Sequence, residues 1–246
     1  MGQVPIKNKS SYLLIGRRRF AKHLANYFTL SGIPYLIWSR SSQKSLSRLI
    51  SSSAKIVVLI NDDEIENFIL QNRKGFEDKI WIHCSGLLLF PFAESAHPLM
   101  TFSEELYDLE TYERIPFITE KGKMHFNELF QELHNQSFWI EKELKAYYHA
   151  WCVISGNFTT ILWERFFEIL ENEFGISRQY AFTYLSIIGK NLMMNDTPLT
   201  GPLSRNDQKV IQKNLTALEL KDDPFVLVYK SFVETYNKLN KNKVKK

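Results

Sequence analysis

The sequence predicts an α/β protein in which a doubly wound Rossmann sheet over residues 1–140 is followed by an all-α domain over residues 141–246. In the first half, short apolar runs alternate with amphipathic segments, which is the strand–helix rhythm of a doubly wound sheet. The first of these runs ends in a glycine turn that opens a helix, where such folds grip a phosphate. Beyond residue 141, apolar residues recur at helical spacing.

Four near-continuous apolar runs predict parallel strands that are buried on both faces of a sheet. They cover residues 12–16, 34–39, 55–60 and 79–84. The amphipathic segments between them predict helices, the first closed by Ser31 and Gly32 and the third capped by Asp62 or Asp63. Later elements are predicted as strands over residues 115–119 and 137–140 and a helix near 122–135.

The second half predicts one long helix and three shorter ones. Residues 141–174 are apolar at helical period, and Gly175 ends the segment. The other helices are predicted over residues 177–195, 204–218 and 223–239. Their aromatic content favours a buried homodimer seam, and a tightly packed intrachain bundle is the alternative. The residues that indicate this seam are Trp163, Phe166, Phe167, Phe174, Tyr180 and Phe182.

Composition argues against several classes of protein. The formal net charge of +4 is too small, and too weakly striped, for a nucleic-acid binder. Cys84 and Cys152, the only cysteines, lie far apart in the sequence, which disfavours a disulfide framework or a cysteine metal site and favours a reducing cytosol. The N-terminal residues lack the apolar run of a signal peptide, and no stretch reaches about eighteen uninterrupted apolar residues. We therefore expect a cytoplasmic protein with no membrane span and no metal.

The turn after the first strand reads GRRRFA from Gly16 onward, where a dinucleotide-binding turn reads G-x-G-x-x-G or G-x-G-x-x-A. Gly16 supplies the tight bend and Ala21 allows close helix packing, but Arg18 replaces the glycine that lets the backbone approach the pyrophosphate. On one interpretation, Arg17, Arg18 and Arg19 bind phosphate through their charge at a helix N-terminus. On the other, Arg18 fills the site, and cofactor binding is weakened or lost.

The second strand is followed by Ser39, Arg40 and Ser41, without the acidic residue that NAD-binding enzymes use for the ribose hydroxyls. An arginine beside a serine suits a 2′-phosphate instead. The sequence therefore predicts NADP(H) as the nicotinamide cofactor. The alternative is that Arg40 is an ordinary surface arginine.

Polar residues also follow the third and fourth strands. Asn61 and Asp62 follow one strand, and His83 and Ser85 stand at the end of the next. Ligands of open α/β sheets bind outside this carboxyl edge, so these residues are candidates for a site. His97 precedes a proline in a loop that could fold over the same crevice. Each histidine could equally be a structural hydrogen-bonder or a packing residue.

A family resemblance rests on an ordered set of motifs rather than on the phosphate turn alone. In chain order they are GRRRFAKHL, WSRS, INDDEI, HCSG, SAHPLMTF, YYHAWCVISGNF and LTGPLSRND. Over roughly residues 12–220, the sequence resembles a family of bacterial oxidoreductase-like proteins that pair an NADP-type Rossmann domain with a helical C-terminal domain. That family is similar in architecture to pyrroline-5-carboxylate reductase, ketopantoate reductase and the 6-phosphogluconate dehydrogenase superfamily.

The resemblance implies a location for each part of a bound cofactor. The turn Gly16, Arg17, Arg18, Arg19, Phe20 and Ala21 would meet the pyrophosphate, Ser39, Arg40 and Ser41 the adenosine phosphate, and Asn61, Asp62, His83 and Ser85 the nicotinamide side. His97, His149, Asn157 and residues 200–207 would line a cleft between domains. The sequence departs from the family pattern at Arg18 and Ala21, where glycines are usual, and at Asn61, where a proline is usual.

The helical half supplies candidates for substrate chemistry. Lys145 and His149 lie four residues apart and so share a helix face, with Asn157 two turns further on. Because histidine titrates near neutrality, His149 or His97 could act as a general acid. The alternative is that His149 packs within an aromatic interface helix.

A turn-rich segment follows later in the same half and adds polar side chains. Thr200, Arg205 and Asp207 of this segment could contact a substrate, and Arg205 could bind a carboxylate or phosphate through a bidentate fork. Asn206 or Asp207 would alternatively serve as the N-cap of the next helix. The residues assigned to the substrate are therefore Lys145, Thr200, Arg205 and Asp207.

Together these features favour a homodimeric, NADP(H)-dependent oxidoreductase that passes a hydride to or from a small polar or acidic substrate. The alternative is a catalytically inactive Rossmann-like dimer that binds another nucleotide, a phosphorylated metabolite or a protein partner. The arginine triplet that begins at Arg17 is the feature that separates the two hypotheses.

Overall fold

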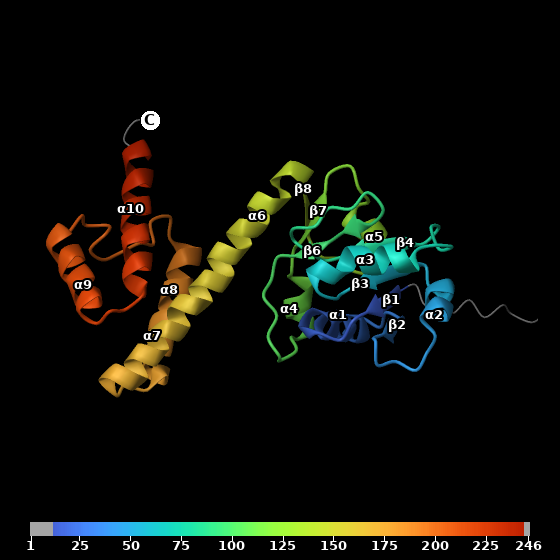
Figure 1. The fold of residues 1–246 in the computed structure, drawn as a ribbon, viewed down its shortest axis with the longest axis horizontal. Coiled ribbons are helices and arrows are strands. Elements are labelled where there is room, and N and C mark those ends of the chain that lie inside the picture. The colour runs from blue at the N-terminus through green and yellow to red at the C-terminus, as the bar shows by residue number, and fades with distance from the viewer. Residues whose placement is uncertain (1–11, 244–246) are drawn as a thin grey trace, which may run out of the picture. The chain divides into compact units, whose positions relative to one another are not determined.

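The computed structural model of the protein describes residues 12–243 (Figure 1). It divides into two compact units, Met1–Trp163 and Glu164–Lys246. The strands of the described chain all belong to the first unit, and the second is helical. The N-terminal residues considered above for a signal peptide lie outside the described range.

A five-stranded parallel sheet forms the centre of the first unit, with the order β2-β1-β3-β4-β5. Its strands are β1 (Tyr12–Ile15), β2 (Tyr35–Trp38), β3 (Lys55–Val58), β4 (Ile80–His83) and β5 (Glu94–Ser95). The chain passes from β1 to β2 on one side and then returns to β3 on the other side, so the strand order reverses between β1 and β3. Ligands of doubly wound sheets bind outside the carboxyl ends of the strands at this reversal point.

Helices cover both faces of the sheet because its central strands are apolar on both faces. All four residues of β1 are buried, and successive side chains alternate between two hydrophobic clusters. The helix α1 (Arg19–Leu30) packs in the cluster that contains Leu14. The helices α2 (Leu46–Ser52) and α3 (Asp62–Asn72) pack in the cluster that contains Leu13. The predicted doubly wound sheet is confirmed.

A three-stranded sheet completes the first unit. Its strands are β6 (His97–Pro98), β7 (Phe117–Glu120) and β8 (Ser137–Ile140), with β7 in the centre, antiparallel to β6 and parallel to β8. Two short helices, α4 (Leu109–Glu113) and α5 (Phe126–Leu129), lie between these strands in sequence. Only Ala96 separates β5 from β6, and its amide donates to the His83 carbonyl at 3.0 Å. One extended segment therefore serves both sheets.

Two of the local predictions in this unit are wrong. The helix expected near 122–135 is limited to α5, because Gly122 has a φ of +83° and Phe130 leaves the helical region. The residue that caps α3 is Asn61, since Asp62 and Asp63 already lie inside the first helical turn.

A helical run follows β8 and changes conformation along its length. It comprises the 3₁₀ turn η1 (Lys142–Leu144), α6 (Lys145–Cys152), the π-helical segment η2 (Val153–Phe158) and α7 (Thr159–Phe174). The predicted end at Phe174 is confirmed, and Gly175 follows with a φ of +64°. The predicted domain boundary after residue 140 coincides with the end of β8, whereas the division between the compact units falls within α7.

The second unit continues with the 3₁₀ turn η3 (Arg178–Ala181) and the helices α8 (Phe182–Met194), α9 (Gln208–Leu220) and α10 (Phe225–Lys243). The three predicted helices are confirmed. Within residues 12–243, no helix combines the length and the apolar character needed to cross a bilayer. In the same range, His, Cys, Asp and Glu side chains form no group of three or more that could hold a metal ion.

Candidate functional site

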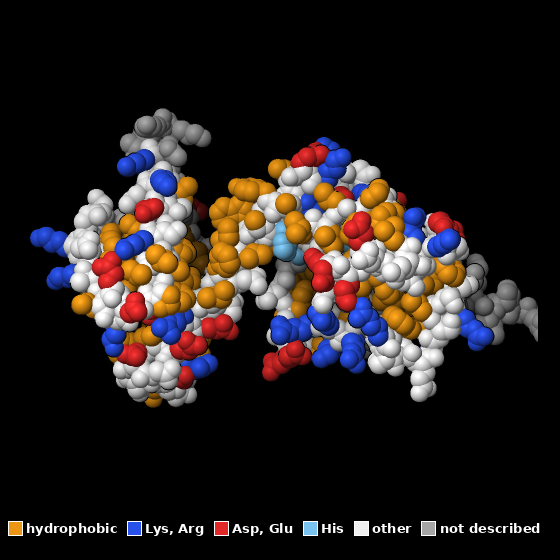
Figure 2. Space-filling model, viewed as in Figure 1, with side chains coloured by type: hydrophobic (Ala, Val, Ile, Leu, Met, Phe, Trp, Pro, Cys, Tyr) orange, Lys and Arg blue, Asp and Glu red, His pale blue; other side chains and the backbone are white. Residues whose placement is uncertain are grey.

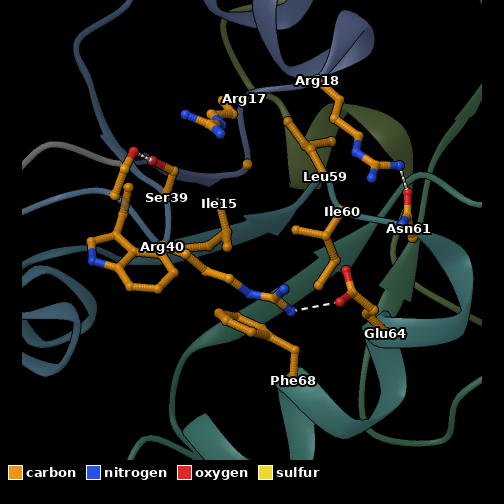
Figure 3. A pocket seen from close by; sticks show the side chains of 13 residues that line it. Ile15, Arg17, Arg18, Ser39, Arg40, Leu59, Ile60, Asn61, Glu64 and Phe68 are labelled. Atoms are coloured by element: carbon orange, nitrogen blue, oxygen red, sulfur yellow. Dashed lines mark hydrogen bonds and ion pairs between the residues drawn. The ribbon is translucent and has the colours of Figure 1, made fainter.

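A cavity of about 220 Å³ opens at the carboxyl edge of the parallel sheet, where the strand order reverses (Figure 3). Its walls come from the ends of β1, β2 and β3 and from the first turns of α3. The lining residues are Ile15, Gly16, Arg17, Arg18, Trp38, Ser39, Arg40, Ser41, Leu59, Ile60, Asn61, Glu64 and Phe68. The site predicted for the phosphates and for the adenosine half of a dinucleotide therefore forms one continuous surface.

Gly16 forms the floor of this cavity. Its φ is +132°, and a Cβ atom there would lie 2.3 Å from the carbonyl oxygen of Leu59. Its amide donates to the Trp38 carbonyl at 2.9 Å, and the Leu59 amide donates to the Ile15 carbonyl at 2.8 Å. Three strand ends thus converge on a position that only glycine can occupy without strain.

The three arginines of the turn point in different directions. The Arg18 guanidinium donates to the side-chain oxygen of Asn61, so it bridges the ends of β1 and β3 (Figure 3). Arg19 pairs with Glu104 at 3.0 Å, away from the cavity. Arg17 lines the cavity and, among the described residues, forms no ion pair. Arg18 also lines the cavity and its partner Asn61 is uncharged, so the charges of Arg17 and Arg18 are available to a ligand, whereas that of Arg19 is paired. Lys and Arg side chains gather over the region of α1 in Figure 2.

Arg40 reaches across the mouth of the cavity to Glu64 of α3, with an Nη2–Oε1 distance of 2.6 Å (Figure 3). The Arg40 side chain is 78% exposed, so this ion pair is open to exchange with a ligand. Ser39 and Ser41 share a hydrogen bond of 3.0 Å between their hydroxyls on the same rim. Glu64 and Phe68 were not predicted as lining residues, although helical spacing on α3 places them one turn apart on one face.

A second cavity, of about 190 Å³, lies further along the same edge toward β4. It shares Arg18, Leu59 and Ile60 with the first and adds residues from α1, α3 and the end of β4, among them Phe20, Asp62, Cys84 and Ser85. The Ser85 hydroxyl donates to the Asp62 carboxylate at 2.5 Å and accepts from the amides of Leu87 and Leu88. The predicted pair Asp62 and Ser85 is therefore brought together by the fold.

His83 lies beneath this edge and is fully buried against Phe90, with their rings 5.1 Å apart. Neither ring nitrogen has a hydrogen-bond partner among the described residues. Burial, with the nearby charges of Lys145 and Lys123, lowers the pKa of His83 to about 3. The imidazole is thus neutral at physiological pH. Its assignment to the nicotinamide side stays a prediction.

Two other predicted histidines meet just beyond Ser85. The rings of His97 and His149 are 5.9 Å apart and nearly perpendicular. Both pack on Gly86, where a Cβ atom would lie 2.4 Å from His149 Cδ2 and 2.9 Å from His97 Nε2. The Tyr148 hydroxyl lies 2.9 Å from His97 Nδ1. Burial, followed by the influence of His149 and Lys145, lowers the pKa of His97 to about 4.

Lys145, predicted to contact a substrate, is instead held inside the first unit. Its side chain is 3% exposed, and its ammonium donates to Glu120 at 2.6 Å, to the Ser95 hydroxyl at 2.7 Å and to the Leu88 carbonyl. Burial lowers the pKa of Lys145, although Glu120 opposes that shift. This network fixes the start of α6 to β5 and β7. A direct substrate contact for Lys145 stays a prediction.

The remaining predicted residues lie elsewhere. Asn157 is exposed in the π-helical segment η2 of the first unit. Thr200 and Arg205 are exposed in the turn before α9 of the second unit. Asp207 caps α9 by accepting from the Val210 amide at 3.1 Å, which confirms its predicted structural role.

The sheet topology defines a Rossmann-type fold, in which ligands bind at this sheet edge, followed by a helical region. The chain belongs to the family defined by a domain of unknown function, DUF2520, whose model matches residues 118–242. No protein with curated annotation matches the sequence.

Solved structures share the fold over nearly the whole chain. A "putative NADP oxidoreductase" from Bacteroides fragilis has a TM-score of 0.74 and 20% identity, covering 92% of this chain and 97% of its own. The protein TM1727 from Thermotoga maritima has a TM-score of 0.68 and 18% identity, covering 94% and 99%. A reductive aminase from Aspergillus terreus, in complex with NADPH and ethyl levulinate, has a TM-score of 0.66 and 13% identity, covering 94% of each chain. The predicted fold class and family resemblance are confirmed.

Proposed function

We propose that the protein is an NADP(H)-dependent oxidoreductase that acts on a small polar or acidic substrate. The observation that carries this proposal is the cavity at the reversal point of the sheet, floored by Gly16 and flanked by Arg17 and Arg40. Arginine guanidinium groups suit phosphate, and glycine lets the backbone approach it. The NADPH bound to the structurally similar reductase supports the same choice of cofactor.

The residues present fit such a cofactor. Arg17 would neutralise the pyrophosphate above Gly16, and Arg40 with Ser41 would bind the 2′-phosphate, releasing Glu64. The nicotinamide half would extend into the second cavity, and Arg18, which is bonded to Asn61, lines both cavities. Because the hydrogen bond between Arg18 and Asn61 is exposed, moving the Arg18 side chain away from Asn61 should cost little free energy.

Bound NADPH would supply a hydride for a carbonyl or imine carbon, and the protein would supply orientation and protons. His149, which packs on Gly86, would give a proton to the substrate heteroatom. Asp62 and Ser85 are hydrogen-bonded to each other at the wall of the second cavity, where they would contact the nicotinamide side of a bound cofactor. Thr200, Arg205 and Asn157 remain candidates for substrate contacts.

Calorimetric titration with NADPH and NADH tests the cofactor assignment. We expect NADPH to bind more tightly than NADH. Arg40→Ala should weaken NADPH about tenfold to a hundredfold and leave NADH nearly unchanged, because a hydrogen bond to a charged group contributes about 1.5–3 kcal/mol. Arg114→Ala is the matched control, since Arg114 is about equally exposed and also paired with a glutamate, but lies outside the cavity at the C-cap of α4. Equal losses in both variants, or no preference for NADPH, would contradict the assignment.

A second function is favoured by the bridge from Arg18 to Asn61. If this bridge closes the path between the two cavities, the protein would be an inactive Rossmann-like dimer that binds a smaller phosphorylated ligand in the first cavity alone. In that case native protein would bind no NADPH, whereas Arg18→Gly would. Tight NADPH binding by the native chain would eliminate this alternative.

The second unit supports the expected homodimer. Its helices expose large apolar side chains on the surface, which appear in orange over that unit in Figure 2. The most exposed include Phe174, Tyr180, Leu192, Met193, Met194, Leu220 and Leu227. Monomeric proteins rarely expose so many large apolar groups. A second copy of the chain is the partner that we propose for this unit.

A further inference from the structure

The hydrogen bond between Tyr148 and His97 restricts which ring nitrogen of His97 can carry a proton. The hydroxyl lies 2.9 Å from Nδ1, and the two rings are nearly perpendicular. The Cys152 thiol lies within hydrogen-bonding reach of the same hydroxyl. A thiol sulfur is a weak acceptor, whereas an imidazole nitrogen is a strong one. Donation of the Tyr148 O–H to His97 Nδ1 uses the stronger acceptor and leaves the phenol oxygen available to the thiol.

The other ring nitrogen, Nε2, faces a different environment. It packs against Gly86 beside His149, and among the described residues it has no hydrogen-bond partner. Gly86 follows Ser85, which lines the second cavity. Burial keeps His97 neutral, since its pKa falls to about 4, so the ring holds a single proton near pH 7. If Nδ1 accepts from Tyr148, that proton resides on Nε2.

We propose that Tyr148 is a positioning residue that locks His97 in the tautomer protonated at Nε2, so that His97 presents a hydrogen-bond donor beside Gly86 and His149. A neutral imidazole N–H is suited to polarising a carbonyl or imine and holding it, while His149 supplies the proton. This division of roles between the histidines rests on the proposed function. The assignment of the His97 tautomer does not rest on that function.

NMR of protein labelled with ¹⁵N at histidine tests the proposal without substrate or cofactor. Long-range proton–nitrogen correlations report which ring nitrogen is protonated, and a His97→Gln variant assigns the signals. In the native protein at pH 7.5, we expect a protonated Nε2 and an unprotonated Nδ1. In Tyr148→Phe, which keeps the ring but lacks the hydroxyl, we expect both tautomers of His97 to be populated.

Tyr147→Phe is the matched control, because Tyr147 is the adjacent residue on α6, is 65% exposed and contacts Trp151. It should leave the His97 signals unchanged. A native protein protonated at Nδ1, or a Tyr148→Phe variant with an unchanged tautomer, would overturn the proposal. If Tyr148→Phe does not fold, the spectrum of the native protein alone still shows which ring nitrogen of His97 is protonated. Failure of NADPH binding would reject the proposed function while leaving this result intact.

Discussion

At the residue scale, the phosphate turn shows which features follow from residue type and which depend on the direction that a side chain takes in the folded chain. Gly16 is required because the ends of three strands converge on it, and a glycine at that place could be predicted from the turn pattern. The direction of Arg18 could not, because it depends on Asn61 at the end of a strand 43 residues later. The same holds for His83, whose position at a strand end indicated a site although the neighbouring Phe90 buries it.

The burial of His83 predicts a pH dependence of stability. The pKa is lowered from 6.5 to about 3 in the folded protein, so the unfolded chain binds more protons between these values. The contribution of neutral His83 to the free energy of unfolding is therefore fully present above about pH 6.5. It is lost as pH falls toward 3, by about 1.4 kcal/mol per pH unit. We expect His83→Phe to flatten this slope, which urea unfolding between pH 7 and pH 5 would measure as a difference of about 2 kcal/mol.

The control for His83→Phe is the same substitution at the exposed His134, which should leave the slope as in the native protein. The half-buried His97, whose pKa is also lowered, adds to the loss of stability at acid pH, so the slope of His83→Phe should be reduced and not abolished. A slope equal to that of the native protein would show that His83 is not protonated differently on unfolding.

At the element scale, long periodic segments were predictable and short or irregular ones were not. The apolar runs of β1, β3 and β4 give a signal over several residues, and α7 ends at a glycine. The two-residue strands β5 and β6 are too short to show alternation, and their pairing is decided by partners distant in sequence. The π-helical segment adds a residue to a turn without altering the apolar period enough to detect.

The attachment of α6 to the sheets predicts a large effect of Lys145→Met. The substitution leaves Glu120 buried without its cation, which should lower the free energy of unfolding by about 3–5 kcal/mol. The double variant Lys145→Met with Glu120→Gln should recover a substantial part of that loss, because no unpaired charge remains. Chemical denaturation of the native protein and both variants would measure this.

The control in this series is Lys142→Met, because Lys142 lies one turn earlier in the helical run, is 70% exposed and pairs with the exposed Glu143. Its effect should be well below 1 kcal/mol. If Lys145→Met were as mild as Lys142→Met, the buried network would not be what fixes the start of α6.

At the scale of the whole molecule, the fold class was predictable because it depends on element order rather than on any single contact. The site was only partly predictable. The glycine-turn pattern and the residues after the second strand indicated Gly16, Arg17, Arg40 and Ser41 as phosphate-site candidates, and these residues line one cavity. The sequence could not show that Lys145 is enclosed by partners from β5 and β7, which become neighbours only in the folded chain.

The exposed apolar helices predict an oligomer. Light scattering coupled to size-exclusion chromatography should give twice the mass of one chain. Tyr180→Glu and Met193→Glu, which place charge on side chains 75% and 79% exposed in the second unit, should shift the protein toward the monomer. Leu30→Glu on the Rossmann unit, at a side chain 46% exposed, should not. A native monomer, or equal effects at all three positions, would contradict the homodimer.

Two residues of the β5–β6 segment contact two residues of α6 at a similar spacing. Ser95 contacts Lys145, and two residues later His97 contacts Tyr148, three residues further along the helix. Two strand residues advance about 6.6 Å and three helix residues about 4.5 Å, so the two spacings are similar enough for long side chains to close both bonds. One inserted residue would nevertheless break one of the two contacts, because it turns the following side chain by about 100° around the helix or to the opposite face of the strand. Insertions and deletions within either short stretch are therefore expected to cost the protein the bond to Lys145 or the bond to His97.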